Sequence, residues 1–281
     1  EIREQPDVLA RVLADPTIAN VGTSLRAAAP SLVLSFARGS SDNAVSFFAY
    51  LAGVALGLPV ASVPPSLMTL NAAPMQARGA LALGVSQSGE SRDVVAALRA
   101  AAERGAMTLA VANTPNSSLA QGAVFALEQH AGTERAVAAS KTFTSQMMVL
   151  ARVVAEWADD DGLRAALEAV PSALHALLAD TRAVDLVAAR LTHADQVDVL
   201  GRGLSFAVAF ELALKLKETS YLHAHAYSSA EFQHGPIASL GPGDPILLLG
   251  VSDATAETNR EAATRIRAAG ADLTVISADP E

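Results

Sequence analysis

The sequence predicts an α/β protein made of two similar domains, each a parallel sheet flanked by helices on both faces. Short apolar runs alternate along the chain with longer stretches in which apolar side chains recur at helical spacing. This alternation is typical of parallel sheets, whose strands are buried on both faces. Two motifs of the first half recur in the second, which indicates a duplicated unit. Hydrophobic residues make up 51% of the chain, which is enough for real cores.

The first half is expected to alternate helices and strands from its N-terminus. A helix over residues 1–15 ends before Pro16, and the apolar run 32–37 forms a strand that leads into a helix over 42–56. The next strands are expected at 60–63, 80–85, 107–112 and 123–127, with a helix over 92–103. Because helices connect successive strands, we expect the strands to pair in parallel.

Helices are also expected to connect the two halves. The helices and the strand of this region fall at 141–157, 163–178, 184–191 and 197–200. We therefore expect a first domain over residues 1–165 and a second over residues 166–281 that includes the connecting helices. The first unit continues well beyond Gly105, whereas the chain stops soon after the corresponding Gly270, so the second domain is expected to be incomplete at its C-terminal end.

The duplication is supported by two short matches. The segment around Arg38 resembles the segment around Arg202, at an offset of 164 positions. Gly84–Glu90 resembles Gly250–Ala256, at an offset of 166 positions. The first copy carries Ser-Gln-Ser-Gly, whereas the second has Asp253 in place of the glutamine, and an aspartate would repel a bound anion. We therefore expect one anion site, in the first half.

The candidate anion site is the segment 83–91, Leu-Gly-Val-Ser-Gln-Ser-Gly-Glu-Ser, between a buried strand and a helix. The first N–H groups of a helix have no partner within it, and the helix dipole there favours an anion. Serine hydroxyls add donors, and glycine lets the backbone approach closely. We interpret the segment as a phosphate cradle. The alternative is a plain helix N-cap, for which serine is equally suited. Neither the Walker loop nor the dinucleotide-binding fingerprint is present.

Composition excludes several classes of function. The formal net charge is −9 and no basic stripe is present, which argues against nucleic acid as a partner. An anionic substrate must therefore be held by local donors rather than by the overall field. The chain has no cysteine, which excludes disulfides, thiolate catalysis and cysteine-ligated metals. No apolar run reaches the roughly 18 residues of a membrane span, and no signal peptide is visible, so a cytoplasmic protein without membrane association is expected.

The second half concentrates ionisable residues in the stretch 210–236. Two of the three lysines of the chain lie there. Glu211, Lys215 and Glu218 share one face of a predicted helix, at positions i, i+4 and i+7. Spacing alone favours an exposed ion pair for this set, because such pairs are common on helix surfaces.

The histidines of the same stretch are candidates for two roles, metal binding and acid–base catalysis. His223 and His225 lack the accompanying carboxylates and histidines of a familiar metal site, so no metal is expected. His234 lies in a His-Gly-Pro loop, and a loop histidine is a candidate acid–base group near neutral pH.

Four motifs, taken in order, resemble the double sugar-isomerase (SIS) domain family. They are Ser86–Ser91, Gly132–Glu134 with Ala138–Phe143, Leu214–Glu218, and Glu231–Pro236. The resemblance covers almost the whole chain, up to Asp279. Within the family, the sequence is similar to the isomerase half of glucosamine-6-phosphate synthase and to stand-alone glucosamine-6-phosphate deaminases.

The resemblance implies a sugar-phosphate site that needs no cofactor. The implied substrate-binding residues are Ser40, Ser41, Ser86, Gln87, Ser88, Ser91, Val137, Ala138 and Ala139. The resemblance implies Glu218 as the base that moves a proton between C1 and C2, with Lys215 stabilising the enolate charge. It implies His234 as the group that opens the sugar ring, supplied by the other subunit of a homodimer.

The implied reaction converts glucosamine 6-phosphate to fructose 6-phosphate and ammonia. Three other readings stay open: the isomerase part of a glutamine:fructose-6-phosphate aminotransferase, a deglycase or isomerase of another sugar phosphate, and a non-catalytic sugar-phosphate sensor. The chain has Arg38 where the synthase has a cysteine, and Ala139 where it has a serine. The lysine-bearing C-terminal tail of the family is not found in this sequence. The opening Arg38–Asn43 looks more like the deaminase branch.

Overall fold

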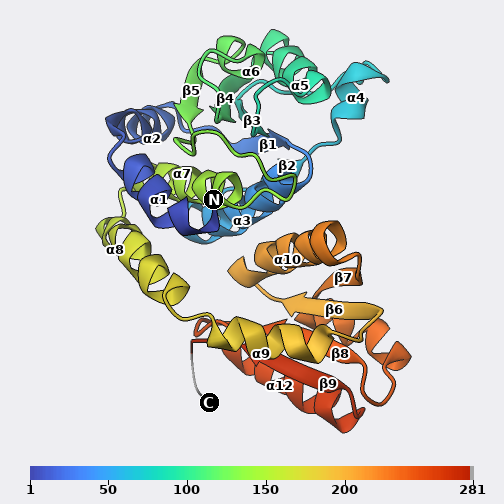
Figure 1. Ribbon diagram of the computed structural model, residues 1–281. Coiled ribbons are helices and arrows are strands. Elements are labelled where there is room, and N and C mark those ends of the chain that lie inside the picture. Colours follow the sequence, from blue (N-terminus) through green and yellow to red (C-terminus); the bar gives the residue numbers. More distant parts are fainter. Residues whose placement is uncertain (279–281) are drawn as a thin grey trace. The chain divides into compact units, whose positions relative to one another are not determined.

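A computed structural model describes residues 1–278 and divides the chain into two compact units, Glu1–Ala179 and Asp180–Glu281 (Figure 1). Each unit has its own parallel sheet. The sequence placed the domain boundary after residue 165, whereas the structure packs the helix Asp161–Leu178 with the first unit.

The first unit is built on a five-stranded parallel sheet in the order β2-β1-β3-β4-β5. Its strands are β1 (Leu32–Phe36), β2 (Val60–Ser62), β3 (Ala80–Ser86), β4 (Met107–Ala112) and β5 (Phe125–Glu128). All seven residues of β3 are buried, as expected for the central strand of a covered sheet. From β1 the chain crosses to β2, and from β3 it crosses the other way to β4. In open α/β sheets, ligands bind where two neighbouring strands are followed by crossovers in opposite directions. The binding site lies beside the carboxyl ends of these strands.

Helices cover both faces of this sheet. The helices of the first unit are η1 (Ile2–Glu4), α1 (Gln5–Leu13), α2 (Pro16–Ala28), α3 (Ser40–Leu56), α4 (Pro65–Thr69), α5 (Arg92–Glu103), α6 (Ser118–Gln121), α7 (Lys141–Ala158) and α8 (Asp161–Leu178). Figure 1 shows α4, α5 and α6 over one face, and α2, α3 and α7 over the other. Helix α7 packs against α1, α2 and α3, so it is the central helix of its layer.

The N-terminal region differs from the prediction of one helix that ends before Pro16. Pro16 begins a second helix, α2, instead of only ending the first. Proline is well suited to the first helical position, where its missing N–H has no partner to lose. Asp15 completes the start, because its side chain accepts a hydrogen bond from the Thr17 N–H at 2.8 Å.

The second unit repeats the arrangement with a parallel sheet in the order β7-β6-β8-β9 over residues 180–278. Its strands are β6 (Gln196–Gly201), β7 (His223–Ser228), β8 (Pro245–Leu249) and β9 (Asp272–Ile276). Its helices are α9 (Arg182–Leu191), α10 (Leu204–Ser220), α11 (Ser229–Phe232), η2 (Pro236–Ser239) and α12 (Ala256–Ala268). Strand β7 was not predicted, although its alternating sequence His-Ala-His-Ala-Tyr-Ser has the period of a strand.

The duplication extends to backbone conformation. Gly39 precedes α3 with φ 56° and ψ −132°, and Gly203 precedes α10 with φ 64° and ψ −133°. A positive φ of this kind favours glycine, so both helices begin with the same glycine-dependent turn. Each of these helices is 17 residues long.

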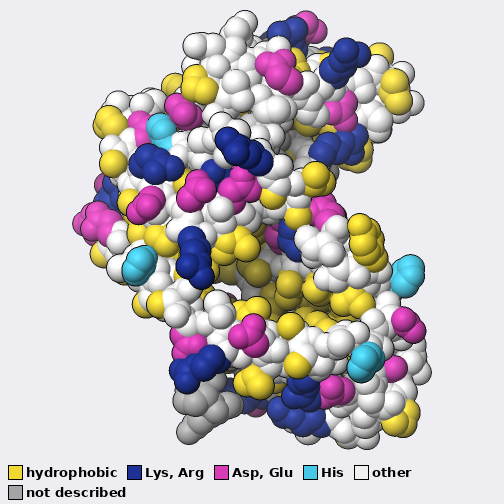
Figure 2. Space-filling model, viewed as in Figure 1, with side chains coloured by type: hydrophobic (Ala, Val, Ile, Leu, Met, Phe, Trp, Pro, Cys, Tyr) yellow, Lys and Arg dark blue, Asp and Glu magenta, His cyan; other side chains and the backbone are white. Residues whose placement is uncertain are grey.

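On the face seen in Figure 2, acidic and basic side chains are interspersed. A search of residues 1–278 finds no helix with the length and apolar character needed to cross a membrane.

A close helix crossing gives a test of the first unit. A Cβ atom on Gly22 of α2 would lie 2.3 Å from the Glu156 Cβ of α7. Gly22→Ala is therefore expected to destabilise the unit by about 1–3 kcal/mol through overpacking. Urea unfolding followed by the fluorescence of Trp157, the only tryptophan, measures the effect.

Gly53→Ala in α3 is the matched control, because no heavy atom outside its own stretch of helix lies within 4 Å of the added Cβ. It is expected to leave stability unchanged or raise it by up to about 1 kcal/mol through helix propensity. A Gly22→Ala protein as stable as the wild type would contradict the close packing of α2 on α7.

Candidate functional site

An open cavity of about 270 Å³ lies in the first unit, between the start of α3, the turn after β3, the segment before α7, and α7 itself. The residues expected to bind substrate gather here. Those that line it are Ser40, Ser41, Ser86, Gln87, Ser88, Ser91, Val137 and Ala139. Ala138 belongs to the same segment but is not part of the cavity wall. The structure thus brings together side chains from three separate parts of the sequence.

Three of the serine hydroxyls are held in the same way, with the oxygen accepting a hydrogen bond from the protein. The bonds run from Gln146 Nε2 to Ser41 at 3.1 Å, from the Gly89 N–H to Ser86 at 3.1 Å, and from the Glu90 N–H to Ser88 at 3.2 Å. None of these hydroxyls donates to another group within residues 1–278. A hydroxyl can donate as well as accept, so each has a proton to offer to a ligand in the cavity.

Ser91 is held differently. It occupies the N-cap position of α5 but makes no capping bond, and its hydroxyl instead donates to Asp93 Oδ1 at 2.8 Å. The other oxygen of Asp93 pairs with Arg38, whose Nε lies 2.9 Å and Nη2 2.8 Å away. Burial acts to raise the pKa of Asp93, but hydrogen bonds from Ser91 and Arg38 outweigh it and lower the pKa below 3.8. Arg38 therefore brings a neutralised positive charge to the cavity wall.

The turn after β3 depends on Gly89. Its φ is +70°, and a Cβ atom there would lie 2.1 Å from Ser117 Oγ. The turn is tied to neighbouring segments by two backbone bonds, from the Asn113 N–H to Gln87 O and from the Leu119 N–H to Gly89 O, each 3.0 Å long. The glycine thus allows a close backbone approach that fixes where the serines lie.

A buried amide pair forms the floor of the cavity. Gln146 of α7, which is 1% exposed, donates to Ser41 and to Gln129 Oε1, the latter at 3.4 Å. Gln129 in turn donates to the Ser86 carbonyl oxygen at 3.1 Å. Sequence reasoning missed Gln146. The available signal was its position one helical turn after Thr142, on a helix face that is otherwise apolar.

Glu134 also lines the cavity, but its carboxylate is engaged. One oxygen accepts hydrogen bonds from the N–H groups of Ser140 at 2.8 Å and Lys141 at 2.9 Å. The other accepts a hydrogen bond from the Thr142 hydroxyl. These bonds satisfy the first donors of α7, and an acidic group there also complements the helix dipole. Glu134 therefore closes the segment onto α7.

The second unit holds the expected ionisable set on α10. The Lys215 Nζ lies 3.4 Å from Glu211 Oε1 and 2.6 Å from Glu218 Oε2, so one ammonium bridges two carboxylates. The side chains are 7%, 21% and 31% exposed for Glu211, Lys215 and Glu218. The Glu211–Lys215 pair is therefore not the exposed ion pair favoured by spacing alone, because Glu211 is buried, whereas the Lys215–Glu218 bond is exposed.

His234 is exposed and follows α11, where its N–H donates to Glu231 O at 2.9 Å. In the part of the chain that the structure describes, no polar contact joins its side chain to Lys215 or Glu218. His223 and His225 lie on β7, and His225 Nδ1 is 3.6 Å from Asp198 Oδ1. No cluster of three or more potential metal-binding side chains is found among residues 1–278.

Comparison with known proteins identifies the fold. A family model described as the SIS domain matches residues 30–155 and 190–281. This chain belongs to the SIS domain family. The two matched segments contain the serine cavity and the ionisable set of α10, respectively.

The curated relatives are longer proteins. Glutamine–fructose-6-phosphate aminotransferase [isomerizing] of Salmonella typhi is 37% identical over 209 residues, which are 71% of this chain and 34% of the relative. The enzyme of the same name from Zymomonas mobilis is 39% identical over 214 residues, 73% of this chain and 35% of the relative. The SIS chain thus spans about a third of the length of these relatives.

Solved structures match over all or nearly all of the chain. A Silicibacter pomeroyi protein provisionally named a phosphosugar isomerase is 40% identical, with a TM-score of 0.92 over 100% of this chain and 85% of that one. The C-terminal domain of glucosamine-fructose-6-phosphate aminotransferase from Francisella tularensis is 27% identical, with a TM-score of 0.89 over 98% and 82%. Glucosamine-6-phosphate deaminase of Thermotoga maritima shares the fold at 21% identity, with a TM-score of 0.73 over 97% and 85%.

The Arg38–Asp93 pair predicts a pH effect. Because the Asp93 pKa is lowered in the folded protein, the pair stabilises the fold above pH 3.8 and this contribution is lost as pH falls through the folded pKa. Arg38→Ala is expected to raise the Asp93 pKa, as read from carboxyl ¹³C shifts in an NMR titration.

Arg26→Ala is the control, since Arg26 pairs with Asp159 rather than with Asp93. It is expected to leave the Asp93 titration in place. An Asp93 pKa that does not respond to Arg38→Ala would show that Arg38 does not contact Asp93 in solution.

Proposed function

We propose that this SIS protein is a phosphosugar enzyme that converts glucosamine 6-phosphate and water to fructose 6-phosphate and ammonia. The observation that carries the proposal is the set of three serine hydroxyls with protons free to donate into one cavity. The phosphate group of a hexose phosphate is an anion that such donors can bind. Fructose 6-phosphate also appears in the name of the curated relatives.

The phosphate is held by neutral groups. Ser41, Ser86 and Ser88 donate to its oxygens, and the N-terminus of α5 adds its dipole. Gln87 and Ser91 complete the turn, and Ser40 and the segment 137–139 contact the sugar. Fixed dipoles of this kind need no reorganisation when the ligand binds. They can hold the phosphate locally although the chain carries a net charge of −9.

The proton transfer is assigned to α10. Glu218 removes the proton from C2 of the open-chain sugar, the electron pair forms the C1–C2 double bond, and the C1 oxygen takes up a proton. Glu218 then returns the proton to C1, which leaves an iminium at C2. Water hydrolyses this iminium to the ketone and ammonia. The Lys215 ammonium, held between two carboxylates, stabilises the negative charge that develops at the C1 oxygen.

His234 is assigned to ring opening, by proton transfer at the ring oxygen. Its exposure in the single chain is compatible with service to the site of a second copy, in a homodimer. The scheme needs a base, an acid and a cation, all supplied by side chains.

A second candidate is the isomerase part of a glutamine-dependent aminotransferase. The identity of the curated relatives, together with the third of their length that this chain spans, favours it. In that case the same residues would act on fructose 6-phosphate with ammonia delivered from elsewhere. Formation of glucosamine 6-phosphate from fructose 6-phosphate and ammonium salts, faster than the reverse reaction, would support this candidate over the first.

The catalytic assignment is tested with glucosamine 6-phosphate as substrate, by assaying fructose 6-phosphate and ammonia. Glu218→Gln is expected to lower kcat by about 10²–10⁴-fold, the range for loss of a positioned base. Glu257→Gln is the control, because Glu257 forms an exposed pair with Arg260 on α12, and it is expected to retain activity. Turnover unaffected by Glu218→Gln would reject the assignment. Turnover only of another sugar phosphate would change the substrate, and binding without any turnover would indicate a sensor.

The phosphate assignment is tested by Ser86→Ala and Ser88→Ala. Each removes one hydrogen bond to a charged group, worth about 1.5–3 kcal/mol, so KM is expected to rise by about 10–100-fold with a smaller change in kcat. Ser46→Ala is the control, since this exposed serine of α3 donates to Asp42 O away from the cavity. An unchanged KM for both cavity variants would place the phosphate elsewhere.

A further inference from the structure

The segment between β5 and α7 supplies Glu134, Ala136, Val137 and Ala139 to the cavity wall, yet it contains no helix or strand. Val137 is 96% exposed, so its side chain is not held by packing. An irregular segment has a large conformational entropy to lose when it adopts one shape. The backbone of this segment must therefore be held by contacts from elsewhere if it is to present a fixed surface to a ligand.

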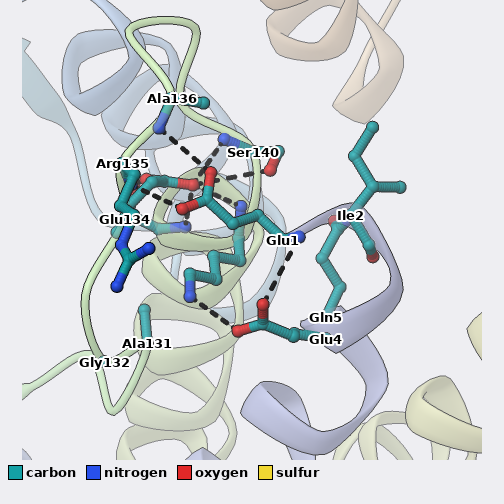
Figure 3. A network of polar contacts seen from close by, with 12 residues as sticks. Glu1, Ile2, Glu4, Gln5, Ala131, Gly132, Glu134, Arg135, Ala136 and Ser140 are labelled. Atoms are coloured by element: carbon teal, nitrogen blue, oxygen red, sulfur yellow. Dashed lines mark hydrogen bonds and ion pairs between the residues drawn. The ribbon is translucent and has the colours of Figure 1, made fainter.

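Glu1 provides such contacts. Its carboxylate accepts hydrogen bonds from the N–H groups of Arg135 and Ala136, at 2.5 and 3.1 Å (Figure 3). Within residues 1–278, these are the only hydrogen bonds that join the backbone of residues 133–139 to another segment. A carboxylate that accepts two successive N–H groups fixes the local backbone, because both bonds are charge-assisted.

Glu4 acts at the next position of the same wall. Its Oε2 lies 2.7 Å from the Nζ of Lys141, the first residue of α7, whose side chain is only 3% exposed. A buried ammonium requires a counter-ion, and Glu4 is the only acidic side chain paired with it among residues 1–278. The hydrogen bond from Lys141 lowers the pKa of Glu4 below its ordinary value, so the Glu4 carboxyl group is charged at neutral pH.

The other end of the segment is tied to the same part of the chain. The Arg11 guanidinium donates to the His130 carbonyl oxygen, with Nε and Nη2 at 3.2 and 3.0 Å. The His130 Nε2 lies 2.9 Å from Asp15 Oδ2. Residues 1–15 thus hold both ends of the segment and its middle.

We propose that Glu1 and Glu4 are positioning residues for the sugar-contacting segment 134–139, so that the N-terminal residues set affinity for the sugar part of the substrate. The inference rests on the proposed function, in which residues 137–139 contact the sugar while the serine turn holds the phosphate. Binding of the sugar and closure of the N-terminal contacts are then linked, and each favours the other.

Binding of fructose 6-phosphate and of inorganic phosphate distinguishes a positioning role of Glu1 and Glu4 from a general contribution to the stability of the fold. Glu1→Ala and Glu4→Gln are expected to weaken binding of fructose 6-phosphate by about tenfold or more, as for a displaced binding group. Binding of inorganic phosphate, which uses Ser41 and the serine turn but not the segment 134–139, is expected to change by less than about twofold. Titration calorimetry measures both. Asp7→Asn, an exposed acid of α1, is the control with the same change of charge.

The outcomes are distinguishable. Wild-type protein that binds neither ligand would remove the proposed function itself. Wild-type protein that binds both, with variants that weaken both equally, would mean that Glu1 and Glu4 only stabilise the fold and would overturn the inference. Variants that bind fructose 6-phosphate like the wild type would also overturn it.

A measurement on the wild-type protein covers the case in which the variants do not fold. Arg135 is exposed within the segment and Arg3 lies between Glu1 and Glu4, so trypsin can report on both. Fructose 6-phosphate is expected to slow cleavage at Arg135 and, through linkage, at Arg3, whereas inorganic phosphate is expected to slow neither. Equal protection by the two ligands, or protection of Arg135 alone, would contradict the coupling.

Discussion

The site depends on hydrogen bonds that fix serine hydroxyls without using their protons. Gln146 and the N–H groups of the turn after β3 occupy the oxygens of Ser41, Ser86 and Ser88, so the protons remain to be donated. This arrangement requires the turn to keep one shape, which Gly89 allows through its positive φ and its close approach to Ser117. It also requires a rigid floor, which the buried pair of Gln146 and Gln129 provides.

In the second unit, the serine that corresponds to Ser41 does not keep a proton to donate to a ligand. Ser205 occupies the position of Ser41 in the repeat, but its hydroxyl accepts from the Arg202 N–H at 3.0 Å and donates to the Leu249 carbonyl oxygen at 3.2 Å. Asp253 likewise accepts hydrogen bonds from the N–H and hydroxyl of Thr255. The Ser205 hydroxyl and the Asp253 carboxylate are therefore engaged within the second unit itself. The distinctive feature of this unit is instead the Lys215 ammonium between two carboxylates.

The first unit also depends on contacts between residues far apart in sequence. Glu134 lies six residues before Ser140 and caps the start of α7. The carboxylates of Glu1 and Glu4, more than 130 positions away in sequence, bond the same segment and the first residue of α7 (Figure 3). Each bond alone is modest in energy, but together they give an irregular segment the fixed geometry that a binding surface requires. Helix α7 is the common support, because it carries Gln146, Lys141 and Thr142 while it packs on α1, α2 and α3.

The sequence alone determined the alternation of strands and helices, the duplication, the serine turn and the helical face of Glu211, Lys215 and Glu218, because each is encoded by local spacing. From the sequence, Pro16 is expected only to end a helix, whereas the folded chain also begins α2 there, because proline is suited to both positions. Only the tertiary structure decided the burial of Glu211, the role of Gln146 and the contacts of Glu1 with residues 135 and 136. Those features depend on which segments pack together, and hydrogen-bond partners more than 100 positions apart leave no local pattern to read.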